Sequence, residues 1–542
     1  MPTYPAFPFA SRPGRALCLA WGATFVLAAA CRPTESAAPP PSVATSDITA
    51  HATTPIANDP LSAALHARWA SAKVTPGTAA TDREYQRRVT LDLVGRIPRP
   101  GELSEFGADP APDKRRRLVR RLLASEEFSA HWADVLTDQL LGGATKIQPA
   151  LQRSTHAWLS DQLTESATWA SMSRELLTVS GPATSPGPSG FISAHGRKGQ
   201  VEALAGATAR VFLGVSIECA QCHDHPQDDS ITQRDFYAFA AYFARTRARN
   251  QKNAGGGRTA VIVDKRFGEM HMPTETDGPG ERSGPVVQPA MLGSAYAEVP
   301  GQTRREALAD SILASSLFAD VTAGRVWAQL MGRALTPRDA AIQGALSDAF
   351  VAGDYDLRHL IETVVLCEAY ARTSRAHGDS APAQRRAFAI ASVRPMSIQQ
   401  LIRSLLVATG RDADSVASRE QAVARLTVKA RRAHIVELDD DDTRSADTPT
   451  MTVPQALFLL GGPLTLRGSD ADGPTTLATI LDRHEGTREQ LDALMRTTLG
   501  RPATAQEHTR LAAYVDGAPD PSAAMEDVMH AVLLSSEFLS IH

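Results

Sequence analysis

Apolar side chains recur at intervals of three and four residues along this chain from Leu61 onward, as Leu118, Leu122 and Leu123 illustrate. This interval matches one face of an α-helix, whereas a half-buried strand alternates at every second residue. Aromatic residues, which favour strands, make up only 6% of the 542 residues. The spacing therefore predicts a mostly α, multi-helical two-domain body with long loops and little β structure. The one segment with the character of a strand is Thr259–Val263.

A short signature occurs three times in this helical pattern. Gly95-Arg96, Gly332-Arg333 and Gly500-Arg501 are each followed closely by a proline, and 33, 38 and 38 residues after the glycine by an aromatic residue. The aromatic residues close the similar segments LLASEEF, VVLCEAY and VLLSSEF. Glycine ends helices and proline starts them, so we expect three related helical modules in which each glycine terminates a helix. Ordinary helix punctuation is the alternative interpretation.

Two charged runs are of the kind that can bind ions or polymers of opposite charge. The basic run Lys114–Arg117 with Arg120–Arg121 would suit a polyanion, but it lies on the polar side of an amphipathic pattern and is expected to face solvent. Asp439–Asp442 could attract calcium, but no ordered ligand spacing follows, which favours a solvated loop. A net charge of -4 argues against a nucleic-acid partner.

The N-terminus predicts export. Arg12 and Arg15 precede the uncharged segment 16–30, which ends in small residues before Cys31, as in a secretory signal. The apolar run is too short for a comfortable transmembrane helix. Leu27–Cys31 resembles the lipobox of bacterial lipoproteins, which predicts lipidation of Cys31 and residues 1–31 as the signal; ordinary cleavage and an uncleaved anchor are the alternatives. Residues 32–59, rich in Pro, Ala, Thr and Ser, predict a disordered tether to a membrane of the periplasm or cell surface.

The chemistry of the chain centres on Cys219-Ala220-Gln221-Cys222-His223, the C-x-x-C-H pattern of covalent haem attachment. Thiols three residues apart on one helical turn can add to the two vinyl groups of a single haem. The adjacent His223 would then bind the iron as the proximal ligand. Met272 is the candidate for the distal ligand. We therefore predict one covalent haem c held by Cys219, Cys222 and His223.

An aromatic run follows the motif. Phe236, Phe239 and Phe243 share one helical face, which could shield a macrocycle from water or could be plain core.

The same motif allows other chemistry. Cys219, Cys222, His223 and His225 include the residue types that bind zinc or iron, although a structural zinc site needs four ligands in a tetrahedron. A disulfide between the two cysteines is a further alternative. No catalytic motif of another class is present, so catalytic residues and enzymatic activity remain unassigned.

Longer segments resemble a known family. Residues 82–106, 113–136 and 210–245 resemble the domain of unknown function 1549, the planctomycete cytochrome-like domain PSCyt2, and residues 219–226 match its CAQCHDHP motif. Residues 317–337, 355–374, 394–410, 452–460 and the closing LLSSEFLSIH resemble its usual partner, the domain of unknown function 1553 (PSD1). Many relatives carry a cytochrome c domain upstream, where this chain has only the tether.

The resemblance implies an exported protein of uncharacterised function, of a family linked by gene context to breakdown of polysaccharides or sulfate esters. We expect a cytochrome-like domain at 60–250, a loop-rich connector at 251–301 and a partner domain at 302–542. The expected role is electron transfer or another redox function in the cell envelope, with redox partners or other envelope proteins. The alternative is a non-redox helical scaffold, or a hydrolase-associated protein, with a structural metal held by cysteine and histidine.

Overall fold

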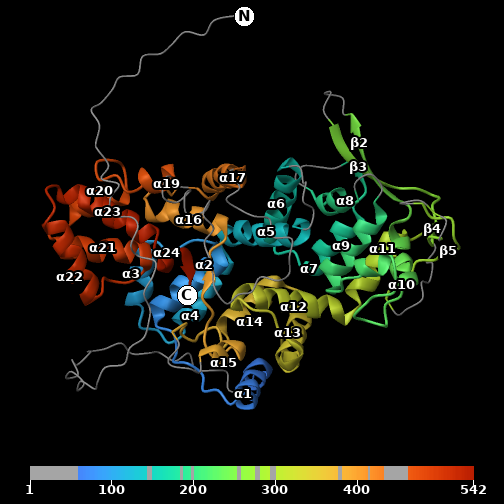
Figure 1. The fold of residues 1–542 in the computed structure, drawn as a ribbon, viewed down its shortest axis with the longest axis horizontal. Coiled ribbons are helices and arrows are strands. Elements are labelled where there is room, and N and C mark those ends of the chain that lie inside the picture. The colour runs from blue at the N-terminus through green and yellow to red at the C-terminus, as the bar shows by residue number, and fades with distance from the viewer. Residues whose placement is uncertain are drawn as a thin grey trace, which may run out of the picture. The chain divides into compact units, whose positions relative to one another are not determined.

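The computed structural model describes residues 59–142, 149–182, 187–196, 200–252, 258–274, 277, 281–292, 301–375, 381–412, 415–432 and 462–542. Figure 1 shows these residues as a coloured ribbon in which helices predominate, as predicted. The predicted signal, which includes Cys31, and nearly all of the tether lie outside the described residues. The acidic run Asp439–Asp442 lies outside them as well.

Helices form the first part of the chain, coloured blue to green in Figure 1. They are α1 (Pro60–Ala72), α2 (Asp82–Val94), α3 (Pro100–Ala108), α4 (Lys114–Leu123), α5 (Glu126–Leu141), α6 (Pro149–Thr164), α7 (Trp169–Thr178), α8 (Gly190–His195), α9 (Val201–Leu213), the 3-10 turn η1 (Glu218–Gln221), α10 (Gln233–Ala240) and η2 (Ala241–Phe243).

Helices also form the second part, coloured yellow to red. They are α11 (Arg304–Leu313), α12 (Ser316–Met331), η3 (Pro337–Asp339), α13 (Ala340–Ala352), α14 (Leu357–Leu366), α15 (Ala381–Arg386), α16 (Ile398–Ala408), α17 (Val416–Arg432), α19 (Pro463–Leu466), α20 (Thr476–Arg483), α21 (Thr487–Leu499), α22 (Ala505–Asp516), α23 (Pro521–Leu533) and α24 (Ser536–Leu539).

The strands in the described part of the chain are few and short. β2 (Thr246–Lys252) pairs antiparallel with β3 (Arg258–Asp264), with Ala248 opposite Ile262, and β1 (Gly181–Pro182) pairs along the other edge of β3. The remaining pairs are β4 (Met270–His271) with β5 (Val286–Val287), and β6 (Arg394–Pro395) with β7 (Ser540–Ile541). The predicted strand is confirmed as the centre of β3. Its partner β2 was not predicted, because its sequence TRARNQK lacks the alternating apolar residues that mark a half-buried strand.

All three signature glycines end helices, as predicted. Gly95, Gly332 and Gly500 follow α2, α12 and α21 with φ angles of 71°, 73° and 76°, and each backbone N–H closes the last turn on the carbonyl four residues earlier. This left-handed conformation costs glycine nothing and strains any residue that carries a Cβ atom.

The arginine after the first glycine joins the ends of two further helices. Arg96 is almost fully buried, and its guanidinium donates to Glu102 in the first turn of α3 and to Glu127 in the first turn of α5, at 2.8 and 2.7 Å. Burial raises the pKa of Glu127, but the hydrogen bonds from Arg96 prevail and lower it to about 2. The arginine thus fixes the angle at which the chain leaves α2.

The third copy repeats this arrangement. Arg501 donates to Glu507 in the first turn of α22 and to Glu537 in α24, at 2.8 and 2.6 Å. Glu537 occupies the same place in SSEF as Glu127 in SEEF. A common arginine–glutamate geometry supports the interpretation of these two segments as related modules.

The middle copy differs. Ala369 stands where the other copies carry the glutamate before the aromatic residue, and Asp339, six residues after Arg333, pairs instead with Arg68 of α1 at 2.6 Å. The glycine turn is kept in this copy, and the arginine link is not.

Helix α2 lies between two apolar cores. Val89 and Leu93 belong to the main core, which draws residues from Leu61 to Ala389, whereas Leu91 joins a second core built mostly from residues 405–541. Its polar side chains reach across as well. Arg87 donates to the carbonyl oxygens of Thr498 and Phe538 at 3.0 and 3.1 Å. Residues far apart in the sequence therefore stabilise this helix on all sides.

The basic run of α4 is only partly solvated, so the expectation for it was partly wrong. Lys114 and Arg115 are buried, and both bind Asp82 at the start of α2, at 2.7 and 2.8 Å. Their alkyl stems cover apolar surface while the charged ends find a carboxylate. The later arginines of the run, such as Arg116 and Arg121, are exposed as expected.

Candidate functional site

The C-x-x-C-H motif lies on a short surface turn between α9 and α10. Ile217 and Ala220 are fully buried and anchor η1, which leaves Cys219 and Cys222 on the outside. Both thiols are exposed, and neither forms a disulfide. The turn therefore holds both cysteine side chains on its solvent-exposed side.

The loop after the motif is fastened to the beginning of α10. The carbonyl oxygen of Gln221 accepts hydrogen bonds from the Tyr237 hydroxyl and from the Gln233 side chain, both at 3.2 Å. The Asp224 carboxylate accepts from the backbone N–H of Gln233 at 2.8 Å. Burial raises the pKa of Tyr237, and the nearby Cys222 adds to this effect, so the hydroxyl keeps the proton that it donates. These clamping residues were not predicted from the sequence.

His223 is oriented by the backbone of the next residue. Its ring is exposed, and Nδ1 lies 2.7 Å from the carbonyl oxygen of Asp224. A carbonyl oxygen can only accept, so a hydrogen bond here requires the proton on Nδ1 and leaves Nε2 with its lone pair. Histidines that bind metals commonly use this arrangement, in which the second nitrogen donates to a carbonyl group.

His225 is held differently. Its backbone N–H donates to Ile231 at 2.9 Å, and its ring Nδ1 accepts from the backbone N–H of Gln227 at 3.3 Å. Among the described residues, no three His, Cys, Asp or Glu side chains come close enough together to hold a metal ion. The zinc or iron site that was the alternative expectation therefore has no preformed ligand set in this part of the chain.

The aromatic run belongs to the core. Phe236, Phe239 and Phe243 are fully buried and pack inside the main apolar cluster, where Phe239 meets Tyr242 edge-to-face at 6.2 Å. Of the two interpretations given to this face, the structure supports plain core, since no exposed wall beside the motif is built from these rings.

Met272 follows β4, in a strand pair that packs against α10. It is half-buried against the main core, and its backbone groups pair with Pro285 and Gly284, both at 3.0 Å. The neighbouring His271 ring interacts with the carbonyl oxygen of Gly284 at 2.9 Å. The assignment of Met272 as the distal ligand stays a prediction.

The donor set of the motif fits a c-type haem. The group requires two accessible thiols on one turn and an imidazole nitrogen with a free lone pair, and Cys219, Cys222 and His223 provide them.

Two family models match long stretches of the chain. The family model PSCyt2, described as a protein of unknown function (DUF1549), matches residues 60–248, and PSD1, described as a protein of unknown function (DUF1553), matches residues 304–515. The chain belongs to the PSCyt2–PSD1 family. No curated protein and no solved structure gives a significant match. The C-x-x-C-H motif of this PSCyt2–PSD1 protein lies within the PSCyt2 match, and both arginine–glutamate modules lie wholly or partly within the matched regions.

In the described parts of this PSCyt2–PSD1 protein, no helix has both the length and the apolar character needed to cross a bilayer.

Proposed function

We propose that this protein is an exported, membrane-anchored electron carrier of the cell envelope with one c-type haem. Cys219 and Cys222 would hold the porphyrin, and Nε2 of His223 would bind its iron. When bound, the haem supplies one-electron chemistry. The observation that carries the proposal is the joint exposure of two free thiols on one turn, beside an imidazole whose Nδ1 is already committed to Asp224.

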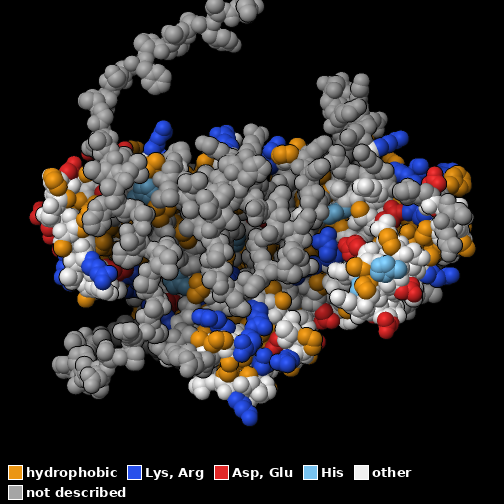
Figure 2. All heavy atoms as spheres, in the orientation of Figure 1, with side chains coloured by type: hydrophobic (Ala, Val, Ile, Leu, Met, Phe, Trp, Pro, Cys, Tyr) orange, Lys and Arg blue, Asp and Glu red, His pale blue; other side chains and the backbone are white. Residues whose placement is uncertain are grey.

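The surface around the motif favours a basic redox partner. Glu218, Asp224, Asp228 and Asp229 are exposed, and residues 216–230 contain no lysine or arginine, although Glu218 pairs with Arg210 at 3.6 Å. Figure 2 shows acidic side chains around histidines over α10. A surface of one sign accelerates encounter with a partner of the opposite sign and makes the rate depend on ionic strength.

The anchor completes the proposal. A lipid on Cys31 and a tether over residues 32–59 would keep the helical body near the membrane, where envelope proteins can meet it. Globomycin, which blocks lipoprotein signal peptidase, should cause the unprocessed precursor to accumulate. Processing that is unaffected by globomycin would argue for ordinary export.

The haem assignment is tested by expressing the full chain in a host that matures c-type cytochromes. We expect a Soret band and a haem that stays with the protein after acid-acetone extraction. Cys222→Ala should leave no thiol for the second bridge and lose most of this haem, whereas the matched control Cys367→Ala should retain it, because Cys367 is buried far along the chain in the α14 region.

Two outcomes would contradict the haem assignment. One is protein without covalent haem in the presence of the maturation system. The other is haem content that is unchanged in Cys222→Ala. Stoichiometric zinc that is lost in Cys219→Ala and His225→Ala would instead support the structural-metal scaffold.

A further inference from the structure

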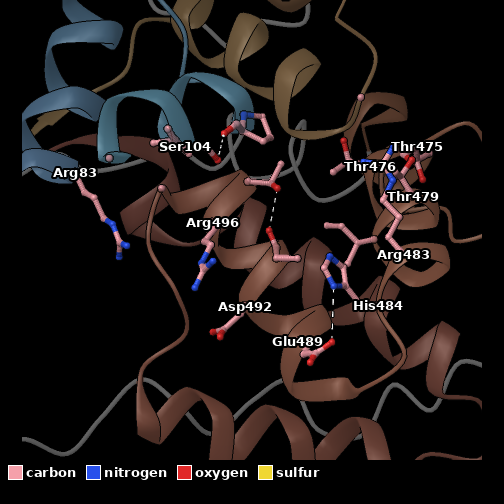
Figure 3. A pocket seen from close by; sticks show the side chains of 18 of the residues that line it. Arg83, Ser104, Thr475, Thr476, Thr479, Arg483, His484, Glu489, Asp492 and Arg496 are labelled. Carbon is pink, nitrogen blue, oxygen red and sulfur yellow. Dashed lines mark hydrogen bonds and ion pairs between the residues drawn. The ribbon is translucent and has the colours of Figure 1, made fainter. Parts of the chain in front are cut away.

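A large groove lies far along the chain from the C-x-x-C-H motif, with a volume of about 1190 Å³. Its lining comes from one face each of α3, α20 and α21, together with Arg83 of α2 (Figure 3). The lining residues of α3 and α21 recur at helical intervals, as Leu103 and Gly107 do on α3 and Ala493 and Thr497 on α21. The PSCyt2 and PSD1 matches both contribute to the groove, so an occupant would contact both.

Three arginine side chains of the groove are available to bind an anionic partner. Arg83, Arg483 and Arg496 are exposed, and none of them forms an ion pair with any residue that the structure describes. Figure 3 shows the guanidinium groups of Arg83 and Arg496 extending in the same direction, and Arg483 beside the threonines of α20. Arg96 and Arg501, by contrast, are each paired with two carboxylates. The groove therefore offers three free guanidinium groups to an anionic partner.

Of the two carboxylates in the groove, Asp492 is held by hydrogen bonds and the exposed Glu489 lies near a histidine. Asp492 accepts hydrogen bonds from the backbone N–H of Ala503 and from the ring of His508, at 2.9 and 3.0 Å. Glu489 lies 3.9 Å from His484, as the dashed line in Figure 3 marks. These groups reduce the positive charge of the groove without binding its arginines.

The hydroxyl groups of the groove have little left to donate. Four of them donate to backbone carbonyl oxygens of their own segments, namely those of Ser104, Thr475, Thr479 and Thr497. The lining contains no Phe, Tyr or Trp on which a sugar ring could stack, and its apolar part is aliphatic, with Leu103 and Ile480. Such a surface suits aliphatic side chains flanked by carboxylates better than it suits a carbohydrate.

The volume of the groove is comparable with that of a short helical segment. An α-helix is about 10 Å across with its side chains and rises 1.5 Å per residue, so about ten residues occupy roughly 1200 Å³. The small residues Gly107, Ala493 and Gly500 along the groove allow a helix backbone to approach closely. Gly107 has open space where a Cβ atom would be.

We propose that this groove binds an acidic amphipathic helix of a partner protein. The apolar face of the helix would lie on the half-buried Leu103 and Ala493, beside the edge of the buried Ile480. Its carboxylates would pair with Arg83, Arg483 and Arg496 at the rim. This site is separate from the proposed haem site and does not depend on haem binding.

The test uses fluorescence anisotropy with the full protein and a fluorescein-labelled helical peptide of about 14 residues. Its leucines recur at intervals of three and four, with glutamates on both flanks; a counterpart carries lysines in place of the glutamates. We expect the acidic peptide to bind and the basic one not to bind. A triple variant should bind the acidic peptide about tenfold more weakly, and its affinity should depend less on salt concentration. It combines Arg83→Gln, Arg483→Gln and Arg496→Gln.

The controls match these changes. A control variant removes three exposed arginines outside the groove that form no ion pair with described residues, by Arg116→Gln, Arg266→Gln and Arg510→Gln. It should bind the acidic peptide with unchanged affinity. Gly107→Trp fills open space in the groove and should abolish binding, whereas Gly101→Trp, on the same helix but outside the groove, should not. Thermal unfolding checks that all variants fold.

Three results would overturn the proposal. They are no binding of the acidic peptide at 0.5 mM, equal binding of the basic peptide, and equal losses in the groove and control variants. A heparin-derived hexasaccharide that binds more tightly than the acidic peptide, and is lost with the groove arginines, would assign the groove to acidic carbohydrate instead.

Discussion

Replacing Gly95 by alanine should destabilise the protein far more than the same change at Gly500. Both glycines end helices with φ angles near 70°, so both variants incur the strain of a left-handed alanine, about 1–2 kcal/mol. Only Gly95 has no room: its added Cβ atom would lie 2.6 Å from Nδ1 of His131 and 3.1 Å from Arg403. The nearest atom to the Cβ atom of Gly500→Ala would be on Leu103, at 3.7 Å, an ordinary contact.

The magnitudes follow from these distances. His131 is fully buried and cannot move away, so overpacking adds about 1–3 kcal/mol at Gly95. We expect a loss of about 2–5 kcal/mol for Gly95→Ala and of about 1–2 kcal/mol for Gly500→Ala.

Urea unfolding followed by far-UV circular dichroism measures both losses, with the m-value as a check that the same transition is compared. Equal losses in the two variants would show that the close approach of His131 to Gly95 contributes nothing, and the reasoning would fail.

Other expected outcomes follow from the buried charges and the thiols. Arg96→Met should cost about 3–5 kcal/mol of folding free energy, because it leaves two partly buried carboxylates without a partner. Arg501→Met should cost only about 1–2 kcal/mol, because the more exposed carboxylates around Arg501 can be solvated by water. Similar costs of the two variants in urea unfolding would contradict this contrast. Burial lowers the pKa of His131 to about 3, so the unfolded chain binds this proton below pH 6.5 and the folded protein does not. Between pH 5 and 6.5 this group should increase the free energy of unfolding by up to about 1.4 kcal/mol per pH unit. His131→Leu should reduce that slope when unfolding is measured across the same pH range. An unchanged slope would refute the assignment. In protein without haem, iodoacetamide should label Cys222 quickly and Cys367 only after unfolding, because Cys367 is buried and burial raises its pKa to about 11. Peptide mass spectrometry measures the labelling of both cysteines. Rapid labelling of Cys367 in the folded protein would contradict its burial.

Local signals in the sequence predicted the features that depend on neighbouring residues. The three glycine turns are confirmed, because glycine's freedom at positive φ is a property of that residue alone. The exposure of the C-x-x-C-H turn allows the chemistry for which the motif was singled out, although haem binding itself stays a prediction. A fourth related segment, Ser315–Phe318 at the start of α12, was missed because its SSLF lacks the glutamate used to recognise the pattern.

Features that depend on distant partners were not predictable in the same way. An amphipathic pattern shows that Phe236 and Phe239 share a face, but it does not show whether that face meets core or cofactor. Burial of Lys114 depends on Asp82, and the sequence gives no sign that the two will meet. The groove combines Leu103 with Ala493, almost 400 residues apart, so only the folded chain reveals it.

The position of α2 between two cores has a consequence for how such a chain can evolve. Leu91 completes a core whose other members come almost entirely from the last third of the chain. A gene that kept only the PSCyt2-matched region would leave Leu91 and the buried Arg87 uncovered, and the product would be prone to aggregation. The two regions are therefore expected to be inherited together, and recombination between them should be tolerated only when both sides of this helix keep their matching surfaces.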